Sequence, residues 1–545
     1  MSTMEGSGST LADVVGNSSQ LLSLWHSQKL GSNQAVKQST QRMLLGLWSR
    51  FWGRSLKQDQ AKWRASHLSV DATDVDDTDA FDGCFVLELP SSDIDSKHWM
   101  DNNPGEVAPS AVVTGQAGIG KSAWLYYALC RRLGEAKPLL WYLHASGLFL
   151  FVKEGVFKLP ADFYCTDFRV LVWTMIDTDS SELDGPNSSV PAELVWHASM
   201  LAVIYITSPQ SSRWRRLRKT TCPAIFLMEA WTKKEMSQLV SINDTLNPSL
   251  TERIYDAFGP IPHLWEQLQD EHKRIRYEHE LADAIASLCS LELERHIADT
   301  SSLTMSEISS MLFLLTRRDP MQPQSMAVVV PLSACVRSRF VDHLRRNWTK
   351  EDMLSVYKRF SRVPGVRDIV ALVFEAFSQR LLMQERTVLD VTSMVLSKDV
   401  MQREKRFDCQ SVVQEPIRLE IHLIKSIDLD DSTEKLAIED GVFYRLHKKS
   451  KAMQATFEGG SFIVQDGCLY LFHFPMSEIC PINAALMAFI QACEGAPAVQ
   501  SWRFVFVVPS DGEFESGPGR LSESCLGLPP QLDGLSVFYF VVSVE

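Results

Sequence analysis

Residues 111–122, which read AVVTGQAGIGKS, constrain the fold of this chain more than any other stretch. A short β-branched run ends in a glycine-rich turn that matches G-x-x-x-x-G-K-[ST] through Gly115, Gly120, Lys121 and Ser122. The helix-forming run AWLYYALCRRL follows at once. A strand, a phosphate-binding loop and a helix in this order predict an α/β domain that holds a nucleotide. The alternative is a chance glycine turn before a helix, and four matched positions in the required context argue against it.

Phosphate binding explains the residue types in this turn. Gly115, Gly118 and Gly120 allow backbone N–H groups to point at phosphate oxygens, and the start of the helix adds the positive end of its dipole. Lys121 is expected to reach the β- and γ-phosphates, and the Ser122 hydroxyl to bind Mg²⁺. The predicted cofactors are therefore a nucleoside triphosphate and Mg²⁺. No segment identifies an adenine pocket and no N-K-x-D segment reads guanine, so these residues leave the base open.

A second acid is needed to complete the Mg²⁺ shell, at the tip of a neighbouring strand. Asp177 fits this role because it ends the apolar run VLVWTMI. Asp179, two residues on, is the predicted catalytic residue that orients or deprotonates the attacking water, with Glu182 as the alternative. The competing interpretation makes residues 177–184 an acidic surface loop.

The next apolar strand, LAVIYI, also ends in polar residues. Thr207 and Ser208 stand where a side chain can sense the γ-phosphate, and Arg213 just beyond is a candidate finger that neutralises charge during catalysis. The alternatives are a turn serine and a solvated basic helix. The basic residues within 213–219 could also bind nucleic acid or act as a nuclear address.

The chain of 545 residues is too long for one core and predicts several domains. The predicted fold class is α/β, with a P-loop NTPase core built on a parallel sheet covered on both faces, then a helical segment and a C-terminal α+β domain. The strands that support the parallel sheet are apolar almost throughout: LLWYLH, LFLFV, VLVWTMI and LAVIYI. Helical periodicity dominates residues 265–360, including MSEISSMLFLLTRR, with one apolar stretch at MAVVVPL.

Four regions follow from these patterns. Residues 1–83 are expected to form a variable, partly disordered arm whose aromatic patch at 43–52 is either a partner-binding helix or a helix packed on the next domain. Residues 84–270 form the P-loop domain, 271–362 the helical segment and 363–545 the C-terminal domain.

Charge and composition narrow the class of protein. The net charge of −13 argues against a chain that binds nucleic acid over its whole surface. The 11 cysteines form no C-x-x-C pair, which indicates reduced thiols. No charged and apolar leader is seen at the N-terminus and no apolar run is long enough to span a membrane. We therefore expect an intracellular protein, cytoplasmic or nuclear, with no membrane partner.

Several of these stretches together resemble the P-loop NTPase module of fungal Crinkler-type and retrotransposon-hot-spot-type proteins. They are GQAGIGKSAWLYYALCRRL, KPLLWYLH, LFVKEGVF, the strand ending at Asp177, and ITSPQSSRWRR, and the resemblance is best over residues 85–270. It implies an ATPase of the signal-transduction, AAA-like class, with ATP as the nucleotide and the roles above for the loop and Asp177. The family's later G-x-P-R-type segment reads GPIPH here, so His263 replaces an arginine that senses the γ-phosphate. Histidine is charged only part of the time near neutral pH, so hydrolysis is less well supported than binding.

The C-terminal region resembles the nuclease-like module of the same family in its order of elements. Such a nuclease needs carboxylates that hold a metal and a lysine on the second strand. Here Glu458 precedes the first strand, Asp466 lies in the turn, and Glu478 follows a second strand that has no lysine. We therefore expect no cleavage of nucleic acid, and we expect Glu375, in LVFEAF, to be a helix carboxylate with a local partner.

Three functions remain after this reading. The first is an ATP-binding, ATP-hydrolysing P-loop protein that acts as a nucleotide-dependent switch for its C-terminal domain. The second is a Crinkler-type effector or genome-defence nuclease, and the third is a nucleotide-binding scaffold with little hydrolysis. The expected partners are the nucleotide and proteins that contact the N-terminal arm and the helical segment, and binding of nucleic acid is left undecided.

Overall fold

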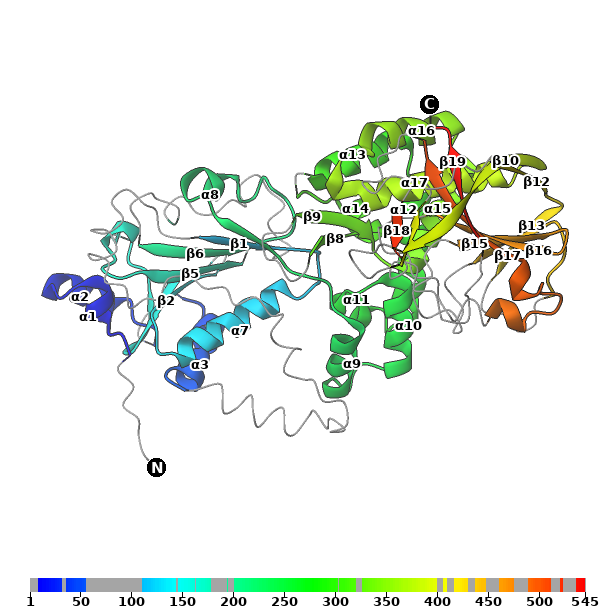
Figure 1. The fold of residues 1–545 in the computed structure, drawn as a ribbon. Coiled ribbons are helices and arrows are strands. Elements are labelled where there is room, and N and C mark those ends of the chain that lie inside the picture. Colours follow the sequence, from blue (N-terminus) through cyan, green and yellow to red (C-terminus); the bar gives the residue numbers. More distant parts are fainter. Residues whose placement is uncertain are drawn as a thin grey trace.

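The computed structural model shows a mixed α/β protein with one mostly parallel sheet and one larger mixed sheet, joined by a group of helices (Figure 1). It describes residues 8–31, 36–54, 110–143, 146–161, 163–177, 194, 200–301, 303–319, 326–398, 405–408, 416–429, 437–446, 460–474, 489–510, 520–522 and 536–544. No helix in these ranges is long and apolar enough to cross a membrane.

The first sheet has seven strands in the order β4-β3-β2-β5-β6-β1-β7. Their bounds are β1 Ala111–Thr114, β2 Leu139–Leu143, β3 Gly147–Val152, β4 Gly155–Lys158, β5 Val172–Asp177, β6 Leu201–Ile206 and β7 Ala224–Leu227. Strands β2, β5, β6, β1 and β7 run parallel. Strands β3 and β4 pair antiparallel at the edge, so the prediction of a parallel sheet is wrong for LFLFV. Only three residues separate β2 from β3, which is too short for a parallel crossover.

Helices cover both faces of this sheet, as its apolar strands require. One face packs against α7 (Lys121–Gly134) and α3 (Gln38–Phe51). The other face packs against α1 (Leu11–Val15), α2 (Ser19–Ser27) and α8 (Arg215–Thr220). Figure 1 shows α7 and α8 on opposite sides of the strands. A short 3-10 helix spans Cys165–Asp167.

The described part of the N-terminal arm is packed on the sheet, although the sequence analysis expected a variable, partly disordered segment. Trp25 and Leu44 are fully buried, and the Trp48 indole donates a hydrogen bond of 2.8 Å to the Val152 carbonyl. Helices α2 and α3 are amphipathic, and the two exposed faces of the sheet give their apolar sides a surface to bury. Of the two alternatives for the aromatic patch, the structure shows the helix packed on the next domain. The acidic stretch at 71–82 lies outside the described residues.

A helical group follows the first sheet. Its helices are α9 Lys233–Ile242, α10 Pro248–Phe258, α11 Pro262–Gln267, α12 Glu271–Ala286, α13 Ser290–Ser301, α14 Glu307–Leu312, α15 Ala334–Asn347, α16 Lys350–Phe360 and α17 Arg367–Leu382, with a 3-10 turn at Pro364–Val366. The start of α9 has the capping box expected from its sequence, with Thr232 and Glu235 bonding each other's backbone N–H groups.

The helical periodicity of MSEISSMLFLLTRR mispredicts its second half. Strand β8 (Phe313–Arg317) starts where α14 ends and pairs antiparallel with β9 (Ala327–Pro331). Short apolar runs fit a helix or a strand equally well by periodicity. The presence of β9 as a partner decides for the strand, because pairing satisfies its backbone groups.

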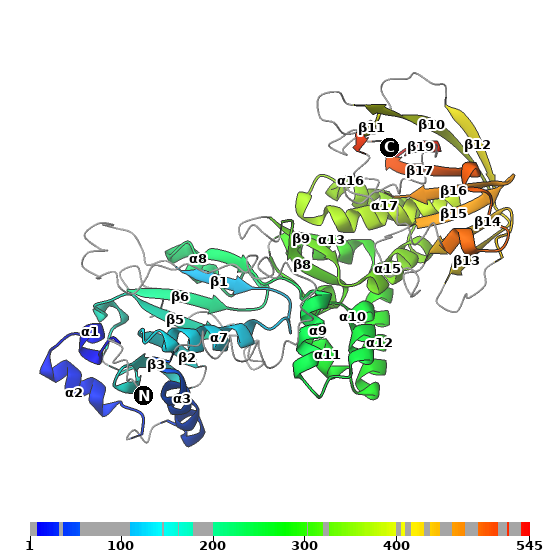
Figure 2. The ribbon, with the colours of Figure 1, turned by 60° about the horizontal axis from the view of Figure 1, so that its bottom comes forward.

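The second sheet runs β13-β14-β15-β16-β17-β19-β10-β11-β18, with β12 paired to β10. Its strands are β10 Arg386–Lys398, β11 Lys405–Asp408, β12 Ile417–His422, β13 Lys425–Leu429, β14 Val442–Leu446, β15 Gly460–Gln465, β16 Cys468–His473, β17 Trp502–Pro509, β18 Arg520–Ser522 and β19 Ser536–Val542, with a 3-10 turn at Val499–Ser501. Both parallel and antiparallel pairs occur, as an α+β domain allows. One hydrophobic core joins this sheet to the helical group, and Figure 2 shows α17 lying along it.

Buried charges lie where α15 and α17 meet the second sheet. Arg337 of α15 and Glu375 of α17 form an ion pair, with the two side chains 9% and 2% exposed. The Gln379 amide donates a 3.0 Å hydrogen bond to the same carboxylate. Burial, together with the nearby charge of Arg337, lowers the pKa of His473 on β16 to about 4. These helices and the sheet are therefore held by polar as well as apolar contacts.

Acidification is expected to destabilise this part of the protein through His473. Its pKa is about 4 in the folded chain and about 6.5 in an unfolded one, so between these values only the unfolded chain binds the proton. The contribution of His473 to the free energy of unfolding is complete above pH 6.5. It is lost progressively down to about pH 4, at up to about 1.4 kcal/mol per pH unit. The free energy of unfolding, measured with urea from pH 7 to pH 4, should depend less steeply on pH in His473→Leu than in wild type. The exposed His422→Leu is the control, and an unchanged slope in His473→Leu contradicts the prediction.

Candidate functional site

The loop between β1 and α7 has the backbone that its glycines predict. Gly118 has φ of 75° and Gly120 has φ of 108°, both in the region that residues with a side chain avoid. A Cβ added to Gly118 would lie 2.7 Å from the Cβ of His263. These two positions therefore require glycine for conformation, and Gly118 requires it for space as well.

Lys121 closes this loop on itself. Its side chain is almost fully buried, and its ammonium donates hydrogen bonds of 3.1 Å to the carbonyls of Gly115 and Gln116. The ammonium thus lies across the loop next to the start of α7, where the first N–H groups of a helix have no partner within the helix. A positive charge beside the N–H groups at the start of a helix is an arrangement that binds anions.

The parallel register brings the other predicted residues to the same edge of the sheet. Ile206 of β6 is opposite Val113 of β1 on one side and opposite Asp177 of β5 on the other. With strands about 4.8 Å apart, Asp177 lies two strands, or about 10 Å, from β1. The Thr207 N–H donates to the Val113 carbonyl at 3.1 Å. Asp177 and Thr207 therefore share the carboxyl edge with the loop.

Three buried polar atoms at this edge make no hydrogen bond, as some do elsewhere among the described residues. The hydroxyls of Thr114 and Thr207 are buried and make no hydrogen bond, and the same holds for Oε1 of Gln116. Buried polar groups are almost always bonded, so each of these three atoms calls for an explanation, and a polar ligand at this edge is one.

Sequence reasoning missed Tyr126, which follows Ser122 by one helical turn and so lies on the same face of α7. Burial and the negative charge of Asp177 raise the pKa of Tyr126, and its ring meets Trp141 edge-on at 5.2 Å. The spacing of four residues between Ser122 and Tyr126 is the sequence signal that places both residues on one face of α7.

The structure brings Ser208 and Arg213 together, with Nη1 of Arg213 donating a 3.0 Å hydrogen bond to the Ser208 hydroxyl. Both follow β6 on the chain. Asp179, the predicted catalytic residue, and its alternative Glu182 lie outside the described residues.

Four hydrogen bonds attach the loop to the helical group, to β8 and to the segment before α9. The Gln116 amide, 1% exposed, donates to the carbonyls of Ser310 and Phe313 at 2.6 and 3.1 Å. The His263 N–H donates to the Gly118 carbonyl at 3.3 Å, and the Trp231 indole donates to the Ile119 carbonyl at 2.9 Å. The hydrogen bond from His263 to the loop therefore comes from its backbone, and its Cβ lies close to Gly118. No local pattern in the sequence indicated these long-range contacts.

The residues considered for a nuclease do not form a metal centre in the described part of the chain. The Glu375 carboxylate accepts a hydrogen bond from Gln379, one helical turn away, and it also pairs with Arg337 of α15, which is distant in the sequence. Asp466 lies in the turn between β15 and β16 with φ of 51°. Glu458 and Glu478 lie outside the described residues. Among the described residues, no group of three or more histidine, cysteine or acidic side chains is arranged to hold a metal ion.

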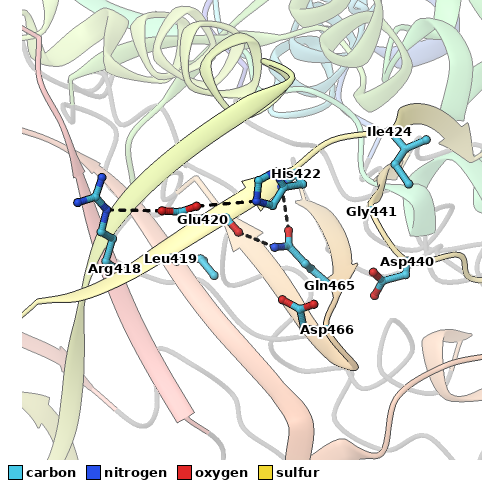
Figure 3. Close-up of a pocket in the computed structure, with 9 residues that line it drawn as sticks. All are labelled: Arg418, Leu419, Glu420, His422, Ile424, Asp440, Gly441, Gln465 and Asp466. Atoms are coloured by element: carbon cyan, nitrogen blue, oxygen red, sulfur yellow. Dashed lines mark hydrogen bonds and ion pairs between the residues drawn. The ribbon is translucent and has the colours of Figure 1, made fainter.

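Asp466 does line an open pocket of about 650 Å³ at the end of β12, shown in Figure 3. The charged side chains of the pocket already interact: Glu420 lies 3.9 Å from Arg418 and 3.8 Å from His422. The Gln465 side chain accepts a hydrogen bond from the His422 N–H and donates one to the Glu420 carbonyl. A hydrogen bond from Arg386 lowers the pKa of Glu420. The two Gln465 bonds link β15 to β12, and among the described residues the pocket offers no group of ligands arranged for a metal ion.

Comparison with known proteins gives distant similarity only. The chain is 26% identical over 174 residues to Crinkler effector protein 15 and to Crinkler effector protein 16, both of Phytophthora infestans. The aligned part is 31% of this chain and spans about a quarter (26%) of each relative. No family model matches the chain, and no solved structure matches it. The similarity agrees with the Crinkler part of the resemblance seen in the sequence.

Proposed function

We propose that this chain binds ATP with Mg²⁺ at residues 115–122 and uses the bound state to control its helical and C-terminal parts. On this proposal, the first sheet with its covering helices is a P-loop NTPase core. The observation that carries it is the glycine loop closed around a buried Lys121 at the carboxyl end of β1, an interior parallel strand. Ligands of open α/β sheets bind at that edge.

The residues present fit a nucleotide's phosphates and its metal. The loop offers backbone donors, Lys121 offers a cation, and the hydroxyls of Thr114 and Thr207 are buried without partners nearby. Ser122 and Asp177 would hold Mg²⁺, which neutralises phosphate charge when bound. The preference for ATP over GTP rests on the sequence resemblance.

Control of the rest of the chain is supported by where the loop is attached. Gln116, Gly118 and Ile119 each bond a residue of the helical group or of the segment that leads into it. That group shares one core with the second sheet. Movement of the loop on binding would therefore also move residues outside the first sheet.

Titration of the full chain with ATP and with GTP, each with Mg²⁺, tests the proposal. We expect ATP to bind with Mg²⁺ present, and Asp177→Asn to weaken the dependence on Mg²⁺ and to reduce any phosphate release. Asp167→Asn, in the 3-10 turn before β5, is the control. Binding without measurable hydrolysis would favour a nucleotide-binding scaffold, and no binding of either nucleotide would exclude the proposal.

A role as a Crinkler-type effector is the second candidate, and it is carried by the similarity to the two Phytophthora infestans effectors. It is compatible with nucleotide binding. Nuclease activity is not favoured, because the Glu375 carboxylate is paired with Arg337.

A further inference from the structure

The loop is held from outside by a tryptophan that lies beyond the first sheet. Trp231 follows β7, and its indole N–H donates to the Ile119 carbonyl at 2.9 Å. The peptide unit between Ile119 and Gly120 is planar and trans, so its carbonyl and its N–H point in opposite directions. By holding the carbonyl, Trp231 turns the Gly120 N–H away from itself.

Neighbouring residues hold Trp231 in place. Its ring meets Trp265 edge-on, with centroids 5.9 Å apart at 85°, and Trp265 is fully buried. The Tyr255 hydroxyl donates to the Trp231 carbonyl at 3.1 Å, and the Trp265 indole donates to the Gly259 carbonyl at 3.0 Å. Helices α10 and α11 therefore fix this indole before any ligand arrives.

Helix α11 holds the preceding residue of the loop, Gly118. The His263 N–H, at the start of α11, bonds the Gly118 carbonyl at 3.3 Å. Two consecutive carbonyls, those of Gly118 and Ile119, are thus bonded by groups outside the sheet. The sheet and the loop sequence do not supply these donors.

From this arrangement we propose that Trp231 is a positioning residue for phosphate binding: its indole N–H orients the peptide unit that presents the Gly120 N–H to a nucleotide's phosphates. The inference rests on the proposed nucleotide binding. It assigns part of the phosphate site to the segment that joins the first sheet to the helical group.

Trp231→Phe in the full chain tests the inference, because it keeps an aromatic ring beside Trp265 and removes the indole N–H donor. We expect the dissociation constants for ATP and for inorganic triphosphate to rise by about tenfold, the scale of one hydrogen bond. The two should rise by the same factor, since the lost contact acts at the phosphates. Trp48→Phe is the matched control, because Trp48 makes the same kind of bond to the Val152 carbonyl. It should bind both ligands as wild type does.

The outcomes separate this inference from the proposed function. Wild-type binding that is lost in Lys121→Ala but unchanged in Trp231→Phe overturns the role of Trp231 and leaves nucleotide binding intact. A wild-type chain that binds neither ligand overturns both. If the Trp231→Phe variant does not fold, hydrogen exchange of the wild-type chain tests the inference instead. Inorganic triphosphate should then protect amides at 118–122 and at 229–235 together, and protection of the loop alone contradicts the inference.

Discussion

Replacing Lys121 with alanine is expected to weaken ATP binding by at least about a hundredfold. The ammonium is the cation of the loop, and hydrogen bonds to charged groups contribute about 1.5–3 kcal/mol each. A loss of about 2.7 kcal/mol corresponds to a hundredfold change in affinity. The variant also removes both 3.1 Å bonds that close the loop, to the carbonyls of Gly115 and Gln116. Isothermal titration of the full chain with ATP and Mg²⁺ measures the effect.

Lys137→Ala is the matched control for this variant, because Lys137 lies just past the other end of α7. It should bind ATP as wild type does. A Lys121→Ala chain that is folded, by circular dichroism, and binds ATP with wild-type affinity would show that the glycine loop does not hold phosphates.

Breaking the Arg337–Glu375 pair is expected to cost about 3–5 kcal/mol of stability. Both side chains are almost fully buried, so Glu375→Ala leaves a guanidinium in the core without its counter-charge. That is a large share of the 5–15 kcal/mol by which folded domains are usually stable. Urea unfolding of the helical and C-terminal parts, followed by tryptophan fluorescence, should show a much lower midpoint.

The double variant Arg337→Met with Glu375→Leu separates the pair from its packing. Apolar replacements of similar size often cost nothing or even stabilise, so the double variant should recover most of the loss. Glu420→Ala removes an exposed partner of Arg386 and should leave the midpoint unchanged. A single variant as stable as wild type would show that the pair does not hold α15 and α17 together.

Several features of the fold could be predicted from sequence because they depend on local pattern. The β1–loop–α7 unit, the apolar strands of the first sheet and the Thr232–Glu235 capping box are all set by residues a few positions apart. The reversed direction of β3, the strand β8 within a helical pattern and the packed helix α2 were not predicted, and the packing of α3 was one of two alternatives left open. Each depends on a partner that is distant in sequence or on a free face of the sheet.

The same division holds for the candidate site. The sequence by itself determined the glycines that permit the turn at Gly118 and Gly120, the cation at Lys121 and the acid at the end of β5. Only the tertiary structure decided that Gln116 bonds β8, that Trp231 and His263 hold the loop carbonyls, and that the Glu375 carboxylate is paired with Arg337. The physical reason is how far apart the interacting residues are in the sequence. Backbone conformation at a turn is dictated by the residues in it, whereas a hydrogen-bond partner a hundred residues away is known only when the chain has packed.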